Sequence, residues 1–306
     1  MSSSSRSFKR LRLSLPPDFD FRSTVGSHGW SILPPFSCDL RWTSLERVFL
    51  TEAGTVLAVM RSAPGALLIE AHSASPLPAG AVRDLKNQVR TCLRIDEDLS
   101  PFHREARSHP EFRWIAARRA GRLLRAPTMF EDAVKMICTT NCTWSLTTLM
   151  VTNLVAAAGQ AYDGTRRAFP RPEEIAGLSE SFMRKEIKSG YRSASLLRLA
   201  EAVASGKLPI EQWRSAAIPT PRLALEMRAV HGIGPYAAGN LLRLAGRYGD
   251  LALDSWVRGA YYRLHCRGRK VKDATIEKAY ARYGEWRGLF FWLEITKAWH
   301  DRKFPA

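Results

Sequence analysis

The stretch Met227–Leu264, MRAVHGIGPYAAGNLLRLAGRYGDLALDSWVRGAYYRL, contains the most informative pattern in the chain. A helical pattern ends in a Gly-Ile-Gly turn, and a second helix is predicted to begin at about Pro235, where a missing N–H costs nothing. Gly232 and Gly234 permit positive φ and a close approach of the backbone to a partner. A turn of this kind and the helix N-terminus behind it can together bind an anion such as a phosphate. By itself, such a turn is equally compatible with a plain connection between helices.

A single carboxylate, Asp254, follows this turn at a suggestive distance. It lies 20 positions after Gly234, beyond one helical pattern and a short loop, at the start of a third helix. This spacing returns the chain to the side of the turn. Asp254 is therefore a candidate for chemistry on whatever the turn holds, although an aspartate here also suits a simple N-cap.

The charge balance favours a polyanionic partner. The 306 residues include 46 Lys and Arg against 29 Asp and Glu, a formal net charge of +17 with an isoelectric point near 10.1. Nucleic acid is the commonest partner of such a surface. An anionic membrane surface, or solubility alone, is the alternative.

Cysteine usage and hydropathy narrow the class of protein further. Five scattered cysteines without a C-x-x-C pair favour a reducing compartment over a disulfide framework or a zinc site. Cys138 and Cys142 are spaced to share a helix face, but two ligands do not make a metal site. No stretch has the length of a signal peptide core or a membrane span. We expect a soluble, cytoplasmic protein that does not contact a membrane.

The pattern along the chain predicts an α+β protein in three parts: a flexible basic leader (1–15), a small domain with an antiparallel sheet and helices (16–110), and an all-α domain (111–306). The runs FDFRSTV (19–25), RVFLTEAGTVLAVMRS (47–62) and GALLIEAH (65–72) are β-like, with a hairpin turn at Glu52-Ala53-Gly54. Residues 81–95 follow with a helical period. From about Phe112 onward the patterns are helical, with an irregular break near Thr139-Thr140-Asn141.

The arrangement GIGPYAA…LALDSWVR (232–238 and 251–258) resembles the helix-hairpin-helix DNA glycosylase superfamily. Looser similarity extends over roughly 21–299, to the bacterial 3-methyladenine DNA glycosylase branch and the 8-oxoguanine glycosylase branch. It is carried by WSILPPFSCDL, LRIDEDLSPF, GYRSASLLRLAEAVASGKLP and YGEWRGLFFWLEITKAW. The resemblance implies a small sheet domain followed by a helix-hairpin-helix domain, and a monomer that binds double-stranded DNA containing a damaged base.

The resemblance also implies roles for individual residues. Asp254 would be the catalytic carboxylate, which stabilises the positive charge on the sugar and activates water. The hairpin would bind the DNA backbone through Gly232, Ile233, Gly234, Tyr236 and Ala237, with help from Arg258. A solvated face explains Arg258, and its neighbours Arg243 and Arg247, nearly as well. The basic run 267–272, RGRKVK, is a further expected backbone contact.

The position of the lysine used by strand-cleaving family members is occupied by Tyr236, which predicts a monofunctional enzyme that uses water. Only Cys266 lies beyond Cys142, so the iron–sulfur cluster of some members is not expected, and no cofactor is required. Some members bind a monovalent cation through hairpin carbonyls. The matching positions are Arg228, Val230 and Ile233.

Flipping a nucleotide out of the duplex requires a group to fill the gap and walls to hold the base. Asn141 matches a residue that contacts the orphaned base in the 8-oxoguanine branch, and a helix cap is the alternative. Aromatic candidates for the pocket are Tyr236, Trp256, Trp144 and Trp292, although most of the nine tryptophans must belong to the core. An alkylated purine is the first expectation for the substrate. An oxidised or deaminated base such as 8-oxoguanine is the second, and a non-catalytic DNA-binding protein is the rival from another class.

Overall fold

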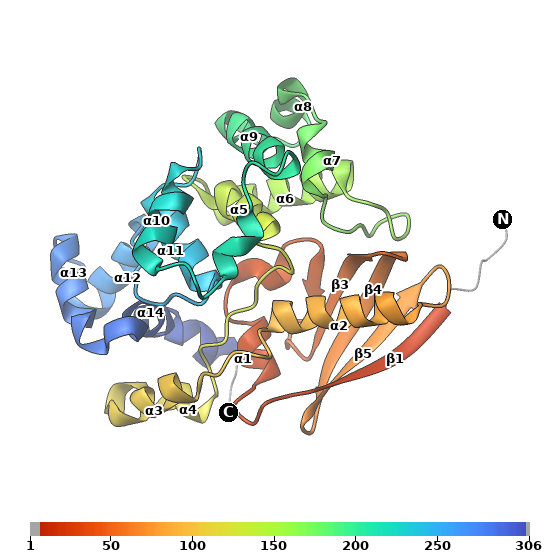
Figure 1. Ribbon diagram of the computed structural model, residues 1–306. Coiled ribbons are helices and arrows are strands. Elements are labelled where there is room, and N and C mark those ends of the chain that lie inside the picture. Colours follow the sequence, from red (N-terminus) through yellow and green to blue (C-terminus); the bar gives the residue numbers. More distant parts are fainter. Residues whose placement is uncertain (1–6, 304–306) are drawn as a thin grey trace. The chain divides into compact units, whose positions relative to one another are not determined.

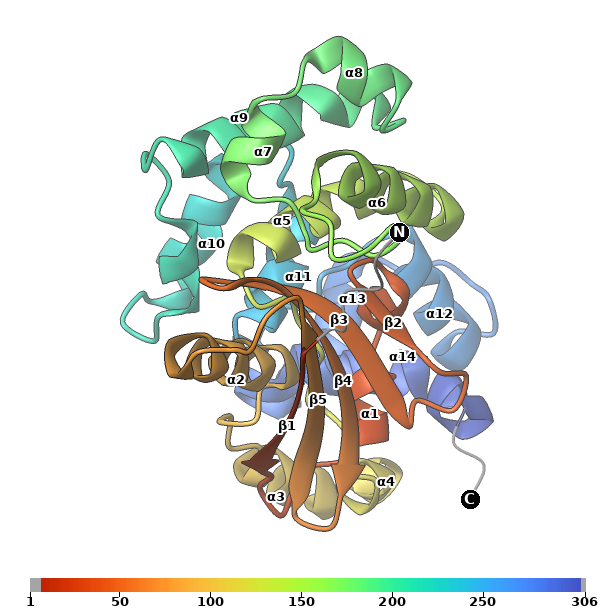
Figure 2. The same ribbon diagram turned by 90° about the vertical axis from the view of Figure 1, so that its right-hand side faces the viewer.

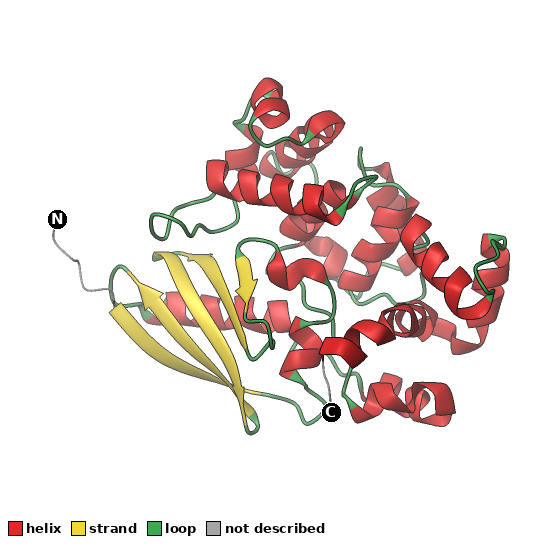
Figure 3. Ribbon diagram, turned by 180° about the vertical axis from the view of Figure 1, so that it is seen from behind, coloured by secondary structure: helices red, strands yellow, loops and turns green. Residues whose placement is uncertain are grey.

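The computed structural model describes residues 7–303, which form one antiparallel sheet and a series of helices (Figures 1 and 3). The predicted α+β class, with the sheet first and the helices after it, is confirmed. The strands are β1 (Ser7–Ser14), β2 (Phe36–Cys38), β3 (Ser44–Thr51), β4 (Gly54–Ala63) and β5 (Ala66–Ser73), in the order β1-β5-β4-β3-β2. The α-helices are α1 (Phe21–Val25), α2 (Ala79–Leu93), α3 (Ser100–Ser108), α4 (Arg113–Ala117), α5 (Met129–Thr139), α6 (Trp144–Ala158), α7 (Pro172–Ala176), α8 (Glu180–Lys185), α9 (Ser193–Ala204), α10 (Thr220–Ala229), α11 (Pro235–Leu244), α12 (Ser255–His265), α13 (Asp273–Tyr280) and α14 (Arg287–Lys303).

The chain divides into two compact units, and each is built from two separate segments. The first, which we call the sheet unit, comprises the chain up to Asp98 together with Arg122–Ile210. The second, the hairpin unit, comprises Leu99–Gly121 together with the chain from Glu211 onward. The predicted domains, 16–110 and 111–306, are continuous segments. The two observed units are not, because the chain enters the hairpin unit at Leu99, returns to the sheet unit at Arg122 and enters the hairpin unit again at Glu211.

The first described residues belong to the sheet and not to a flexible leader. Strand β1 pairs along its whole length with β5, from Ser7 opposite Ser73 to Ser14 opposite Ala66. Leu11 and Leu13 are buried while their neighbours are exposed, which is the alternation of a strand with one covered face. The predicted leader is therefore wrong for residues 7–14, and its first six residues lie outside the described part of the chain.

Local signals explain the next two elements. The predicted hairpin is confirmed, because Glu52 and Ala53 form the two-residue turn between β3 and β4, with Thr51 opposite Gly54. The run 19–25, predicted as β-like, is instead the short helix α1. Its cap is Asp20, whose carboxylate accepts a hydrogen bond of 2.7 Å from the N–H of Ser23. A capping side chain here outweighed the β-branched composition.

Helix α2 runs along one face of the sheet (Figures 1 and 2). Its buried side is formed by Ala81, Leu85, Val89, Cys92 and Leu93, which agrees with the helical period predicted for residues 81–95. Part of the opposite face is covered by the segment after α6, where Ala168 and Tyr162 pack on residues of β3 and β4.

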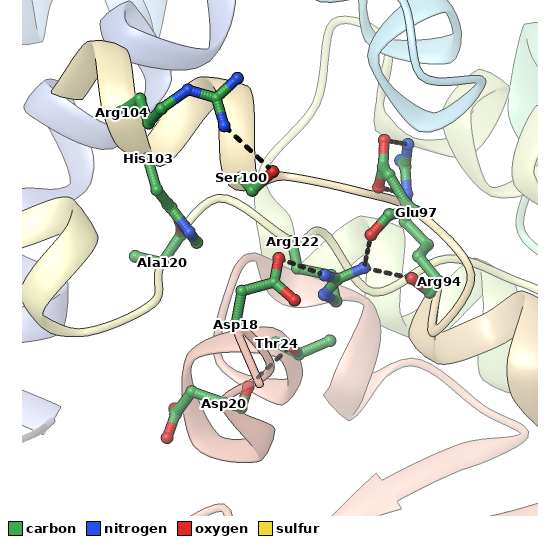
Figure 4. A network of polar contacts seen from close by, with 10 residues as sticks. All are labelled: Asp18, Asp20, Thr24, Arg94, Glu97, Ser100, His103, Arg104, Ala120 and Arg122. Carbon is green, nitrogen blue, oxygen red and sulfur yellow. Dashed lines mark hydrogen bonds and ion pairs between the residues drawn. The ribbon is translucent and has the colours of Figure 1, made fainter. Parts of the chain in front are cut away.

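Buried charges lock the sheet unit together. The Arg47 guanidinium forms two hydrogen bonds, of 2.8 and 2.6 Å, with the Glu131 carboxylate, which also pairs with Lys135 at 2.8 Å. All three side chains are essentially inaccessible. A second buried guanidinium, Arg122, donates to the Glu97 carbonyl at 2.8 Å and to Asp18 at 3.1 Å (Figure 4).

The hairpin unit has an aromatic core between its two segments. Phe102 of α3 and Phe112 both contact Phe290 of α14, with ring centroids 4.9 and 4.8 Å apart. Tyr283 adds a further contact with Phe290 at 4.6 Å. Helices α3 and α4 are therefore fixed by packing on α14, which lies near the C-terminal end of the sequence. Among the described residues, no helix is both long enough and apolar enough to cross a membrane.

Candidate functional site

The predicted helix-hairpin-helix is present in the hairpin unit, with α10 and α11 side by side (Figures 1 and 2). Helix α10 ends at Ala229, and α11 begins at Pro235, as predicted. Gly232 has φ of 92°, which explains its glycine, whereas Gly234 has φ of −84° and needs none on backbone grounds. The expectation of positive φ is therefore wrong for Gly234. A Cβ on Gly234 would meet no protein atom within 4 Å, so only the close approach of a binding partner would require glycine at this position.

The turn presents its backbone outward and is anchored by one side chain. Ile233 is buried (2% exposed), and its N–H donates to the Val230 carbonyl at 3.0 Å. His231, Gly232, Gly234 and Pro235 are exposed. The first N–H groups of any helix have no acceptor within the helix, and here the N-cap residue is Gly234, which has no side chain to cap α11. The turn and the start of α11 therefore lie together at the surface, and their role as an anion site stays a prediction.

Two glycines bring the loop after α11 back towards the hairpin. A Cβ on Gly239 would lie 2.5 Å from Asp250 Oδ1 and 2.9 Å from the Ala252 Cβ, so the loop packs directly on α11. A Cβ on Gly288 of α14 would lie 2.0 Å from the Asp250 carbonyl oxygen, and the Gly288 N–H donates to the Tyr248 carbonyl at 2.7 Å. These contacts were not foreseen. The available signal was a glycine inside each of two helical patterns, which often marks close packing.

This loop delivers Asp254 to the N-cap of α12. Asp254 Oδ1 accepts a hydrogen bond of 2.8 Å from the Val257 N–H, so the cap interpretation is correct as far as it goes. The cap uses one carboxylate oxygen, and no hydrogen bond to Oδ2 is found within residues 7–303. The residue is half-buried. A capped carboxylate is held in one orientation, which suits a charge that must face a reacting group.

Three tryptophans lie close to one another, and the first of them follows Asp254 by two residues. We call them the tryptophan cluster: Trp256, Trp292 and Trp299. Their ring centroids lie 6.1–6.4 Å apart. Trp256 is 46% exposed, while the other two are partly buried. The structure thus brings together Trp256 and Trp292, both predicted as candidates, and adds Trp299, which had no role in the prediction.

The tryptophan cluster is tied to the hairpin by Arg243 of α11. Its guanidinium carbon lies 5.3 Å from the centroid of the Trp292 ring. It donates to Asn240 Oδ1 at 3.0 Å and to the Leu251 carbonyl at 3.2 Å. Burial lowers the pKa of Arg243 to about 10, and the charge of Asp250 has the largest effect in the opposite direction. Arg243 therefore remains a cation at neutral pH and belongs to the interior of the site.

Two other arginines expected to neutralise DNA phosphates are also engaged within the protein. Arg247 donates to the Ser215 carbonyl at 3.0 Å. Arg258 forms two hydrogen bonds of 2.7 Å with the Asp273 carboxylate, and these bonds raise its pKa. A phosphate at Arg258 would have to share the guanidinium with Asp273. The expected free basic face is therefore wrong for Arg243, while the loop 267–272, between α12 and α13, exposes Arg267, Arg269, Lys270 and Lys272.

Asn141 and Trp144 belong to the sheet unit. Asn141 lies in the predicted break between α5 and α6, is exposed, and has φ of 47°. The Arg192 side chain holds this turn by donating to the carbonyls of Thr140 and, at 3.3 Å, of Asn141. The Tyr191 ring, 57% exposed, lies under the Arg192 guanidinium at 4.5 Å, and its hydroxyl lies 3.5 Å from the Asn141 amide nitrogen.

Trp144, at the start of α6, is 41% exposed. One edge of its ring covers Gly29, where a Cβ would lie 2.2 Å from the indole. Trp144 is thus fixed by packing within the sheet unit.

The hairpin carbonyls are compatible with the predicted cation but do not require it. The Val230 carbonyl already accepts the Ile233 N–H and has a second lone pair. Cys138 is buried in α5, and Cys142 lies in the next turn with its sulfur 3.1 Å from the Cys138 carbonyl. Within the described chain no three His, Cys, Asp or Glu side chains cluster as a metal site would need.

Comparison with known proteins shows that this fold occurs in solved structures. No protein-family model matches the chain, and no curated protein sequence matches it. Solved structures do. A 3-methyladenine DNA glycosylase from Archaeoglobus fulgidus is 16% identical with a TM-score of 0.74, covering 94% of this chain and 98% of that one.

Two further solved structures share the fold. MBOgg1, in complex with a low-affinity DNA ligand, is 17% identical with a TM-score of 0.72, covering 96% of this chain and 99% of that one. An 8-oxoguanine glycosylase/lyase from Clostridium acetobutylicum is 15% identical with a TM-score of 0.72, covering 95% and 98%. At such low identity the likeness shows the fold, which is the one shared by these helix-hairpin-helix glycosylases, as the sequence resemblance implied.

Proposed function

We propose that the protein is a monofunctional DNA glycosylase that removes a damaged purine from double-stranded DNA in base-excision repair. The observation that carries the proposal is Asp254, oriented by its own cap bond, in the same compact unit as an exposed helix-hairpin-helix turn. The fold shared with glycosylases of two substrate classes supports it.

The proposed reaction needs only water in addition to the DNA. The turn around Gly232 and Gly234, with the amides of Tyr236 and Ala237, holds a backbone phosphate and fixes the register of the duplex. The target nucleotide leaves the stack. As the bond between C1′ and the base nitrogen breaks, the Asp254 carboxylate stabilises the positive charge on the sugar and accepts a proton from the attacking water. The water oxygen bonds to C1′ and the base departs with the bonding electron pair; a base that is neutral in DNA also takes up the proton that the water gave to Asp254.

The Asp254→Asn variant tests this assignment with little disturbance of the fold. Asparagine caps helices as well as aspartate does, so the bond to the Val257 N–H is kept while the charge is lost. We expect release of base from a lesion-containing duplex to fall by roughly 100-fold or more, while the affinity for the duplex is retained. Base release at the wild-type rate would refute the catalytic role of Asp254.

The absence of strand cleavage rests on Tyr236. A phenol cannot form the Schiff base through which lyases cut the strand. Treatment of a reacting mixture with borohydride should therefore trap no protein–DNA adduct, and strand breaks should appear only after alkali. A trapped adduct would identify a lysine nucleophile and make the enzyme bifunctional.

An alkylated purine is our first candidate for the substrate, because the tryptophan cluster next to Asp254 offers indole faces for stacking. The second candidate is an oxidised or deaminated base, which the likeness to 8-oxoguanine glycosylases favours. Asn141 is proposed to fill the gap left by the flipped nucleotide, and its exposure at the tip of a fixed turn supports this.

A further inference from the structure

Arg243 is the feature of the proposed site that the reaction itself does not use. It lies on α11, the second helix of the hairpin, and is only 4% exposed. Burying a guanidinium is costly, and the cost is met here by contacts with Asn240, Leu251 and Trp292. These three residues come from α11, the loop before Asp254, and α14.

The contact with Trp292 has a consequence for any base that stacks on this ring. A cation over one face of an indole draws on the negative charge of the π-system. A base stacked on the opposite face would then contact a ring that attracts a second cation less strongly. The guanidinium lies 5.3 Å from the ring centroid. Adding a van der Waals stacking distance places such a base roughly 9 Å from the guanidinium.

Arg243 also interacts with nearby carboxylates. Asp250 and Asp254 both act on the guanidinium. Each carboxylate accepts a backbone N–H, Asp250 from Ala252 at 2.7 Å and Asp254 from Val257 at 2.8 Å. Arg243 is the charged group that stands directly on the Trp292 ring.

We propose that Arg243 is a specificity-determining residue that selects neutral damaged bases over cationic ones. The inference rests on the proposed function and narrows its substrate class: an oxidised, deaminated or uncharged alkylated purine is favoured, and a purine carrying a positive charge is disfavoured. At an effective dielectric constant of about 20, two charges roughly 9 Å apart correspond to a discrimination on the order of tenfold.

The same contacts orient the Asn240 carboxamide. Its oxygen accepts from Arg243 at 3.0 Å, and its nitrogen donates to the Tyr236 carbonyl at 3.0 Å. One amide hydrogen and one oxygen lone pair are not used by these two bonds. Asn240 lies one helical turn after Tyr236, so Arg243 sets the direction of a polar group beside a residue predicted to line the pocket.

The test compares duplexes with one lesion each: cationic 7-methylguanine and neutral 8-oxoguanine or hypoxanthine. Single-turnover rates of base release are divided by the uncatalysed rates, because cationic bases leave spontaneously. We expect a larger enhancement for a neutral lesion. Arg243→Met should shift the ratio of the two enhancements about tenfold towards 7-methylguanine, while Arg243→Lys, which keeps a charge, should shift it less.

Arg247→Met is the matched control. Arg247 lies just beyond the end of α11 and also donates to backbone carbonyls, but its partners are Ser215 and Ile218. Its removal should leave the lesion ratio unchanged. Thermal unfolding verifies that each variant is folded. If Arg243→Met does not fold, the wild-type ratio decides, and a larger enhancement for 7-methylguanine overturns the proposal.

Binding separates this proposal from the proposed function. The dissociation constants of Asp254→Asn for the same duplexes, measured by fluorescence anisotropy, report on the base without chemistry. Tighter binding of neutral than of cationic lesions supports the role of Arg243 even if no base is released, whereas equal or reversed affinities refute it. Failure of the wild-type protein to release any base refutes the proposed function alone.

Discussion

Two buried guanidinium groups, one in each compact unit, show how differently a fold can treat the same side chain. Arg47 of the sheet unit is clamped by the Glu131 carboxylate, and the charge of that partner raises its pKa. Arg243 of the hairpin unit is in contact with an amide, a backbone carbonyl and an indole, and burial lowers its pKa. In the first arrangement the buried charges pair with one another, which indicates a role in stability. In the second, the cation acts on a ring beside the proposed catalytic carboxylate, which indicates a role in recognition.

Removal of the Glu131 charge should have the largest effect on stability. Glu131→Gln leaves Arg47 and Lys135 buried without their shared carboxylate, and breaking a buried pair in this way costs about 3–5 kcal/mol. The free energy of unfolding, from denaturant titration, measures the loss. A change below about 1 kcal/mol would mean that water reaches the pair, and the contrast with Arg243 would lose its basis.

Arg243→Met should cost less than Glu131→Gln but should change substrate choice. The loss of hydrogen bonds to Asn240 and Leu251 corresponds to about 1–3 kcal/mol for the acceptors left behind. Arg47→Met is the complementary variant: it should destabilise the protein without changing the ratio of rates on neutral and cationic lesions. A shift of that ratio in Arg47→Met would show that substrate choice responds to stability and not to the charge beside Trp292.

The pH dependence of stability should separate the two sites as well. Burial opposes ionisation of Glu131, but Arg47 and Lys135 lower its pKa below the ordinary value of 4.5. The unfolded chain then binds more protons than the native protein below about pH 4.5, so stability should fall as the pH drops through this region. Glu131→Gln should flatten this part of the curve, whereas Arg243→Met should leave it unchanged. Urea midpoints across pH 3–6 provide the measurement.

Breaking the exposed ion pair of Arg258 and Asp273 should have the smallest effect on stability. Both side chains are partly exposed, at 31% and 46%, and a pair of this kind contributes about 0–1 kcal/mol. Asp273→Asn should therefore change stability little. It should also release Arg258 for a phosphate and tighten binding of undamaged duplex slightly, with a steeper dependence on salt. Weaker DNA binding in this variant would contradict the assignment of Arg258 as a backbone contact.

The parts of the fold that depend on neighbouring residues were predictable. The hairpin turn at Glu52-Ala53, the start of α11 at Pro235 and the break at Asn141 each carry a local signal. Strand β1 also has one, because Leu11 and Leu13 alternate with polar residues, but its serine-rich, basic surroundings masked it. The role of Arg243 had no such signal. Its burial depends on Trp292, which lies 49 positions away in the sequence, and a helical pattern alone does not show which arginine a distant ring will cover.

The interrupted course of the hairpin unit has a consequence for biosynthesis. Phe102 and Phe112 leave the ribosome well before Phe290, on which they pack. The interval spans the whole second segment of the sheet unit and, at about 5–20 residues per second, lasts on the order of ten to forty seconds. During that time these rings lack their native contacts with Phe290 and must be kept from non-native contacts. The protein's yield in a cell should therefore depend on chaperones that shield apolar segments.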